Sequence, residues 1–234
     1  MTTLTSNPVK AQNTTLNAPI GWLTATTNPV RAGTIPVLSW GITYPSKVID
    51  FVNVAAPATV TPRQRLRYEV RVLGAGVTAS NSNGSNMSFV PTEAVFSFNN
   101  SSFSRIFYGT NNAVTPSTVV ASGTADVNQP LRFGGRFFFN NTWSPLYTSS
   151  TGTNNVRALV DGDFPPTTYS LVNAPTLESF IRPYLDSTGR VKIGPMDVII
   201  FMELTHTDAQ NNQMGYDCQD MVLLVTFQTL PSGN

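Results

Sequence analysis

The sequence predicts an all-β protein, an antiparallel sandwich of two sheets, and three observations support this prediction. Seventeen Pro and sixteen Gly interrupt the chain at short intervals, and both residue types break regular structure. The windows between them are short and rich in Val, Ile, Phe, Tyr and Thr, which favour strands. The length of 234 residues suits one sandwich, because single β domains reach this size.

Strands are expected wherever such a window is free of turn residues. They span residues 35–44, 47–54, 64–73, 93–98, 103–108, 117–121, 131–139, 155–160, 197–204 and 221–228. This number of strands, together with long polar loops, favours a jelly roll over an immunoglobulin-like arrangement.

One short helix is expected near residues 174–182, where Asn173 is placed to cap a first turn that contains Pro175. Residues 1–34 predict an extended N-terminal arm with isolated apolar anchors such as Trp22, and residues 35–234 predict a single β-sandwich domain.

Charge is sparse, at 12% of residues against about 25% in an average soluble domain. The net charge of +1 gives no general electrostatic reason to bind nucleic acid. Lys10, Lys47 and Lys192 are the only lysines, so the remaining basic residues are Arg, which is common in protein interfaces. Cys218 is the single cysteine, which excludes a disulfide within the chain. No apolar run reaches the ~18 residues of a membrane helix, so no membrane partner is expected.

A basic strand is the most informative local pattern. Alternation in the predicted strand at residues 64–73 places Arg65, Arg67 and Arg71 on one face with Glu69. Arg63 continues the same face. Such a face either meets acids on a partner or is a solvated face whose arginines pair with acids of the same chain. The second is the more common outcome.

Acidic residues gather at the last predicted hairpin, where Glu203, Asp208, Asp217 and Asp220 lie between or beside its strands. Their oxygens are ligands that Ca²⁺ prefers, and calcium is the only cofactor that the sequence suggests. Acids at strand ends more often cap turns and block edge pairing, so both interpretations stay open.

No catalytic constellation is recognisable, and we expect a protein that is not an enzyme. His206 is the only histidine, and neither a Gly-x-Ser-x-Gly elbow nor a phosphate-binding loop is present. Asp161 and Asp163 are candidates for a glycosidase carboxylate pair, but Gly162 between them indicates a turn.

Large rings occupy both faces of the predicted strand at residues 131–139. Either the strand is buried on two sides, or a partner covers one of them. The pair Gly134 and Gly135 inside this strand predicts a β-bulge.

In its low charge, Arg-rich basic set, extended arm, polar Ser/Thr/Asn loops and predicted jelly roll, the chain resembles the coat and other structural proteins of viruses and phages. The resemblance implies a virion location and a coat, penton or decoration function, in which the chain self-assembles as a homo-oligomer or with other structural subunits. Trp22 and the arginines from Arg63 to Arg71 would then make subunit contacts. Many such coats have a strongly basic internal arm; this chain has none, which argues against packaging of nucleic acid.

The alternative is an extracellular or cell-surface binding module, calcium-dependent and directed at a carbohydrate or another ligand. Its site would combine the aromatic residues Trp143 and Tyr147 with the acidic loop at residues 208–220. A hydrolase with acids in a sandwich cleft is a third class.

Overall fold

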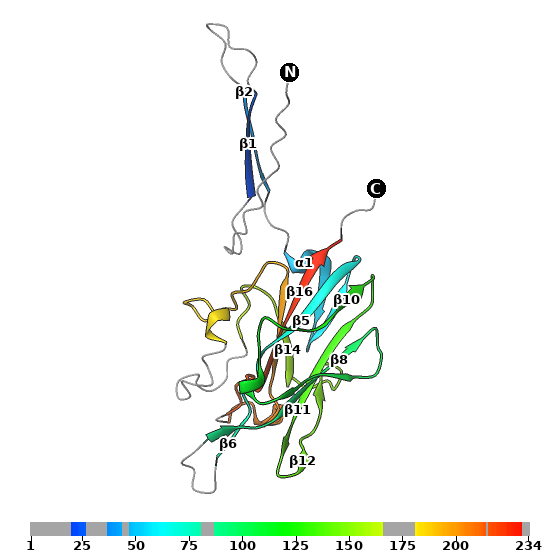
Figure 1. The fold of residues 1–234 in the computed structure, drawn as a ribbon, viewed down its shortest axis with the longest axis vertical. Coiled ribbons are helices and arrows are strands. Elements are labelled where there is room, and N and C mark those ends of the chain that lie inside the picture. The colour runs from blue at the N-terminus through cyan, green and yellow to red at the C-terminus, as the bar shows by residue number, and fades with distance from the viewer. Residues whose placement is uncertain are drawn as a thin grey trace. The chain divides into compact units, whose positions relative to one another are not determined.

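The computed structural model describes residues 20–26, 37–43, 47–80, 87–165, 181–213 and 215–230. The chain divides into two compact units, Met1–Pro45 and Ser46–Asn234. The boundary between them lies after residue 45, whereas the sequence analysis divided the chain after residue 34. Figure 1 shows the strands of both units.

The described part of the first unit is a hairpin of β1 (Ile20–Thr26) and β2 (Val37–Thr43). The two strands pair antiparallel along their whole length. The strand predicted at residues 35–44 is therefore present as β2, but its partner is β1 and not a strand of the sandwich. Strand β1 lies in the segment for which the sequence analysis predicted an extended arm with isolated apolar anchors.

The second unit contains two large antiparallel sheets and one two-stranded sheet among its described residues. One sheet has the order β10-β5-β16-β15-β14. Its strands are β10 (Val119–Ala125), β5 (Leu66–Gly74), β16 (Met221–Thr229), β15 (Asp197–Met202) and β14 (Val156–Leu159). We call it the β5 sheet.

The other sheet, the β11 sheet, has the order β3-β4-β11-β8-β9, with two short strands also paired to β11. Its strands are β3 (Val52–Ala55), β4 (Thr59–Pro62), β11 (Leu131–Phe139), β8 (Thr92–Phe98), β9 (Ser104–Gly109), β12 (Thr142–Trp143) and β13 (Tyr147–Thr148). A separate small pair is formed by β6 (Thr78–Ser80) and β7 (Met87–Phe89). Short helical turns are α1 (Val48–Phe51), η1 (Asn111–Ala113), η3 (Arg182–Tyr184) and η4 (Asp208–Gln210).

The two sheets pack face to face, which confirms the predicted antiparallel sandwich. Tyr68 of β5 lies across from Phe96 of β8 at a ring-centroid distance of 5.8 Å, and Phe96 lies 5.4 Å from Phe133 of β11. All three side chains are buried. Since successive residues of a strand point to opposite faces, the inward-facing apolar residues of both sheets form this core.

The jelly-roll form of the sandwich is not confirmed by the strand order. The consecutive strands β14, β15 and β16 are neighbours in one sheet, and β5 lies beside β16. This order resembles a Greek key in which the earliest strand pairs with the last.

A second apolar core covers the outer face of the β5 sheet. Ile199 and Phe201 of β15 point into it, and they meet Ile181, Val191 and Ile193 from the connection between β14 and β15. As a result β15 is buried on both faces along most of its length. The sandwich therefore has an additional layer that strand alternation did not predict.

The segment at residues 47–54 was predicted as one strand, but its first half is the helical turn α1 and only its end belongs to β3. The backbone N–H of Lys47 donates a 3.0 Å hydrogen bond to the Asp50 carboxylate. This local bond stabilises a turn where β-branched residues favoured a strand. Of the helix predicted at residues 174–182, residues 174–180 lie outside the described part of the chain.

The predicted bulge at Gly134 and Gly135 is wrong, because the pairing of β11 with β8 runs in unbroken register through both residues. A Cβ atom on Gly134 would lie 2.5 Å from the backbone oxygen of Tyr147. Glycine is needed here because β13 approaches β11 so closely.

Candidate functional site

The basic strand has the alternation that the sequence predicts. Arg67, Glu69 and Arg71 of β5 point outward, while the residues between them are buried. The Glu69 carboxylate accepts hydrogen bonds from both arginines, at 3.2 Å from Arg67 and 2.5 Å from Arg71. Arg65 lies 3.3 Å from Asp126, and the side chain of Arg63 is exposed. Three of the four arginines thus have an acidic partner within the chain, which favours the second interpretation of this face.

A more unusual surface lies on the outward face of the β11 sheet and was not predicted. We call it the aromatic–arginine cluster, and it consists of Arg105, Tyr108, Arg136, Phe138 and Trp143. The register of four strands brings them together, because β9, β8, β11 and β12 lie side by side.

Ring and cation contacts hold the aromatic–arginine cluster together. The guanidinium of Arg136 lies 4.2 Å from the centroid of Trp143, and that of Arg105 lies 4.8 Å from the centroid of Tyr108. The Trp143 ring also lies 5.6 Å from Tyr108 and 5.1 Å from Phe138. Cation–π and tilted aromatic contacts of this kind are each worth about 0.5–1.5 kcal/mol.

A buried carboxylate anchors both arginines. Glu93 of β8 has 3% of its side chain exposed and bonds to Nε of Arg105 at 2.5 Å and to Nε of Arg136. Burial acts to raise the pKa of Glu93, but the hydrogen bonds from Arg136 and Arg105 outweigh it and hold the pKa below its usual value. The cluster is therefore a fixed, charged surface. One feature of the sequence could have indicated this cluster. The chain has few charged residues, yet several of them lie inside predicted strands.

The hairpin of the first unit carries exposed apolar side chains. Leu23 of β1 is paired directly with Trp40 of β2, and 69% of each residue is exposed. Trp22, which was predicted to contact a partner, lies in β1 opposite Gly41; its side chain lies outside the described part of the structure. The contact predicted for Trp22 stays a prediction, and the structure adds Leu23 and Trp40 as exposed apolar side chains of the same hairpin.

The acidic residues of the last hairpin do not have a common role. The Glu203 carboxylate is fully buried and accepts hydrogen bonds from the backbone N–H groups of Thr205, His206, Asp217 and Cys218. All four distances lie between 2.9 and 3.2 Å. Because its partners come from both ends of the connection between β15 and β16, Glu203 fixes the path of that connection.

Asp220 lies beside Glu203 and accepts hydrogen bonds from the backbone N–H groups of Leu204 and Thr205, at 2.7 and 3.0 Å. Burial raises the pKa of Asp220 well above its usual value, and the negative charges of Glu203 and Asp217 raise it further. We call Glu203, Asp217 and Asp220 the carboxyl cluster.

Backbone donors already occupy both oxygens of Glu203 and one oxygen each of Asp217 and Asp220. Asp208 lies apart from the carboxyl cluster, since its carboxylate bonds to Asn154 and Tyr216. Among the described residues, no group of three or more His, Cys, Asp or Glu side chains is arranged to hold a metal ion. The geometry therefore gives the calcium hypothesis no support.

The carboxyl cluster predicts that stability falls as pH rises through the acidic range. Burial raises the pKa of Asp217 from 3.8 to about 6, and the negative charge of Glu203 acts in the same direction. A backbone hydrogen bond from Gln219 lowers this pKa but does not outweigh them. The folded protein thus keeps a proton that the unfolded chain releases near pH 4. We expect the free energy of unfolding to decrease between pH 4 and 6, with Asp217 contributing about 2 kcal/mol.

Urea unfolding at several pH values tests this expectation, with Asp217→Asn as the comparison. The amide keeps the oxygen that accepts the Gln219 N–H but does not titrate, so the pH dependence of the variant should be weaker than that of the wild type. Equal pH dependence in both proteins would contradict the expectation. Carboxylates with lowered pKa values, such as Glu93, act equally in both proteins and cancel in the difference.

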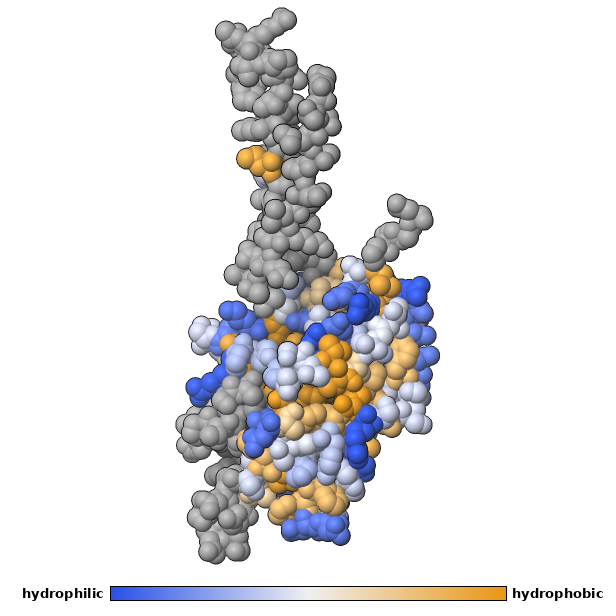
Figure 2. All heavy atoms as spheres, in the orientation of Figure 1, coloured by the Kyte–Doolittle hydropathy of each residue, from blue (hydrophilic) through white to orange (hydrophobic). Residues whose placement is uncertain are grey.

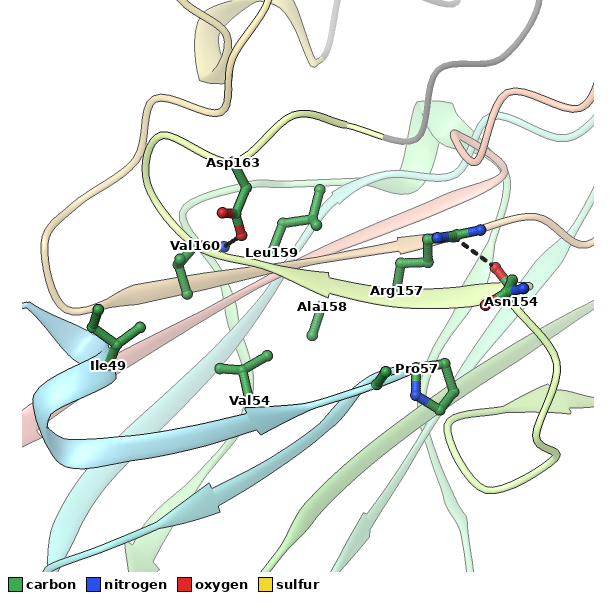
Figure 3. Close-up of a pocket in the computed structure, with 10 residues that line it drawn as sticks. Ile49, Val54, Pro57, Asn154, Arg157, Ala158, Leu159, Val160 and Asp163 are labelled. Atoms are coloured by element: carbon green, nitrogen blue, oxygen red, sulfur yellow. Dashed lines mark hydrogen bonds between the residues drawn. The ribbon is translucent and has the colours of Figure 1, made fainter.

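A groove of about 360 Å³ lies between β3 and β14, each an edge strand of its sheet. Figure 3 shows Ala158 of β14 pointing toward Val54 of β3, which makes the centre of the groove apolar. Its charged residues stabilise the chain itself: Arg157 donates to the backbone oxygen of Asn154, and the Asp163 carboxylate accepts the N–H of Val160.

The carboxylate pair considered for a hydrolase has a similar role. The carboxylate of Asp161 accepts a 3.1 Å hydrogen bond from the backbone N–H of Ile193. Asp163 is bonded to the backbone as described above, and Asp161 and Gly162 form a turn. The observed contacts of both aspartates thus order the connection that covers the β5 sheet.

Comparisons with known proteins place this chain in no family. No protein-family model, no curated protein and no solved structure matches it. In the described ranges, no helix has the length and apolarity required to cross a membrane. The fold and its surfaces define a class, an antiparallel β-sandwich protein with a separate two-stranded hairpin.

Proposed function

We propose that this chain is a non-enzymatic structural protein that self-assembles through repeated subunit contacts, as a virion coat, penton or decoration protein does. The hairpin of β1 and β2 supports this proposal most directly. Leu23 and Trp40 are opposite each other, so their side chains lie on one face and form a single apolar strip. With 69% of each residue exposed, the hairpin has an apolar face to offer to a partner.

The energetics of a two-stranded hairpin argue in the same direction. An isolated hairpin is marginally stable in water, and it needs a third strand or an apolar surface to persist. Burial of a Leu side chain stabilises a structure by about 1.5–3 kcal/mol, and a Trp side chain has more area to bury. A neighbouring subunit that covers Leu23 and Trp40 would stabilise the hairpin in this way.

The aromatic–arginine cluster supports a second contact surface. Interfaces are enriched in Trp, Tyr, Phe and Arg, and residues that dominate binding energies are most often Trp, Tyr and Arg. Tyr108 has 43% and the neighbouring Phe139 has 42% of its surface exposed. Because Glu93 holds Arg105 and Arg136 in place, little side-chain entropy is lost when a partner binds.

Particle size tests the proposal. We expect the purified protein to form regular assemblies in light scattering and negative-stain images, and the double variant Leu23→Asn, Trp40→Ser to shift to monomers. Ile49→Asn is the matched control, since Ile49 is 47% exposed and lies outside both surfaces. A wild-type protein that stays monomeric at high concentration across salt and pH would refute the proposal.

Ligand binding is a second candidate function, favoured by Trp143 and Tyr108 together at the surface. This pair of aromatic side chains supports an extracellular binding module directed at a carbohydrate or another ligand. A monodisperse monomer whose ligand binding is lost in Trp143→Ala would favour this function over assembly.

A further inference from the structure

The hairpin of β1 and β2 has the composition of strands that pair with other strands. Both strands have seven residues, and neither contains a charged residue or a proline. Solvated edges usually carry such residues, because unpaired backbone N–H and C=O groups otherwise attract further strands. Among the described residues, β1 and β2 pair only with each other, so the hairpin offers two uncharged edges as well as its apolar strip of Leu23 and Trp40.

The described sandwich has four edge strands, and three of them are poor acceptors for an added strand. β9 contains Arg105 and β14 contains Arg157. On β14, moreover, the N–H of Ala158 is already bonded to Pro57. β3 has only four residues.

β10 is the exception among these four edges. It has seven residues, Val119–Ala125, and no charge or proline. Its strand pairing is with β5 alone, and within the described residues no other backbone hydrogen bond is made by it. A register shift near Val120 bends its first residues, but the ladder is regular from Ser122 to Ala125. Its free edge matches the hairpin strands in length.

Apolar side chains border this edge. Val119 is 39% exposed, and Val120, Ile106 and Val114 are only partly buried against the core. Figure 2 shows an apolar area bordered by hydrophilic residues on the face of the sandwich that this view presents. An added hairpin at this edge would find an apolar surface for its strip of Leu23 and Trp40.

We infer that the free edge of β10 accepts the β1–β2 hairpin of a second copy of this chain, so that the β5 sheet continues across the subunit boundary. This is strand addition, in which main-chain hydrogen bonds supply affinity and apolar side chains supply specificity. The inference rests on the proposed assembly function and names the contact that would produce it.

Cross-linking between two differently tagged copies tests the contact. One copy carries Thr24→Cys on β1 or Ser39→Cys on β2, two paired positions that between them probe both edges of the hairpin. The other copy carries Ser122→Cys or Thr124→Cys on β10; Ser39, Ser122 and Thr124 are exposed. A disulfide requires Cα atoms within about 7 Å, so a mixed cross-linked dimer is expected with at least one β10 position. Thr188→Cys, in an exposed loop, is the control position and should give none. The native Cys218 is buried and remains in all variants.

A charge variant tests the same edge without cysteine chemistry. Ser122→Lys with Thr124→Lys places two charges on β10, which should reduce the assembled fraction at least tenfold while the melting temperature of the sandwich is maintained. Asn211→Lys with Asn212→Lys adds the same charge to an exposed turn and should leave assembly unchanged.

The outcomes separate the inference from the proposed function. Wild-type assemblies without a cross-link at β10, and unaffected by the lysines there, overturn the inference and leave the proposed function intact. A disulfide formed only within a single chain carrying both Ser39→Cys and Ser122→Cys also overturns it. A monomeric wild type overturns both. Mixed cross-links together with loss of assembly in the lysine variant support the inference.

Discussion

Replacement of Glu203 by Ala should destabilise the protein by about 3–5 kcal/mol, as measured by guanidinium unfolding. Three backbone N–H groups, those of His206, Asp217 and Cys218, lose their acceptor in this variant, whereas the N–H of Thr205 keeps its bond to Asp220. Each buried donor left unpaired costs about 1–3 kcal/mol. Removal of a buried negative charge beside Asp220 offsets part of this loss. The cost of the three unpaired donors is expected to exceed the gain from removing one charge.

Glu203→Gln is the matched control for this prediction. The amide retains one oxygen acceptor at the same place, so a loss of less than half that of the Ala variant is expected. Both variants should also show a weaker pH dependence, because the charge that helps to raise the pKa of Asp217 and Asp220 is gone. An Ala variant within about 0.5 kcal/mol of the wild type, the range of ordinary surface changes, would contradict the role of Glu203 in fixing the connection.

Replacement of Phe133 by Ala should reduce the free energy of unfolding by about 3–5 kcal/mol. Phe133 is fully buried between the sheets and lies 5.4 Å from the ring of Phe96. Truncation of a ring at this place leaves a cavity that the packed neighbours cannot fill.

Phe139→Ala on the same strand is the control, because 42% of Phe139 is exposed. Its loss should be about 1 kcal/mol or less. The difference between the two variants checks whether the inner half of the aromatic strand belongs to the core. Equal losses would show that Phe139 is covered as completely as Phe133, as it would be if a partner sat on it.

The sequence left open whether the aromatic strand at residues 131–139 is buried on both faces. In the structure its two faces differ. Phe133 belongs to the core and Phe137 packs against it, while Phe138 lies outward against Trp143. The alternation that separates these side chains follows from the sequence. The contact between Trp143 and Phe138 could not be predicted from the sequence, because it requires that β12 pair with the end of β11.

The sequence by itself determined the class of fold and the positions of most strands. The strand predicted at residues 131–139 is present with the same bounds, and those at 197–204 and 221–228 differ from β15 and β16 by at most two residues. These segments were predictable because apolar and β-branched residues are bounded by turn residues, and that information is local. The alternation of Arg67, Glu69 and Arg71 was predictable for the same reason.

Only the tertiary structure decided which strands are neighbours and which charged groups meet. Glu93, Arg105 and Arg136 come from three strands and converge through register, and Glu203 reaches Asp217 and Cys218 through the path of a loop. The additional layer over the β5 sheet and the pairing of β2 with β1 also depend on contacts between distant segments. Strand order and register are set by the packing of whole faces, which no local pattern of residues specifies.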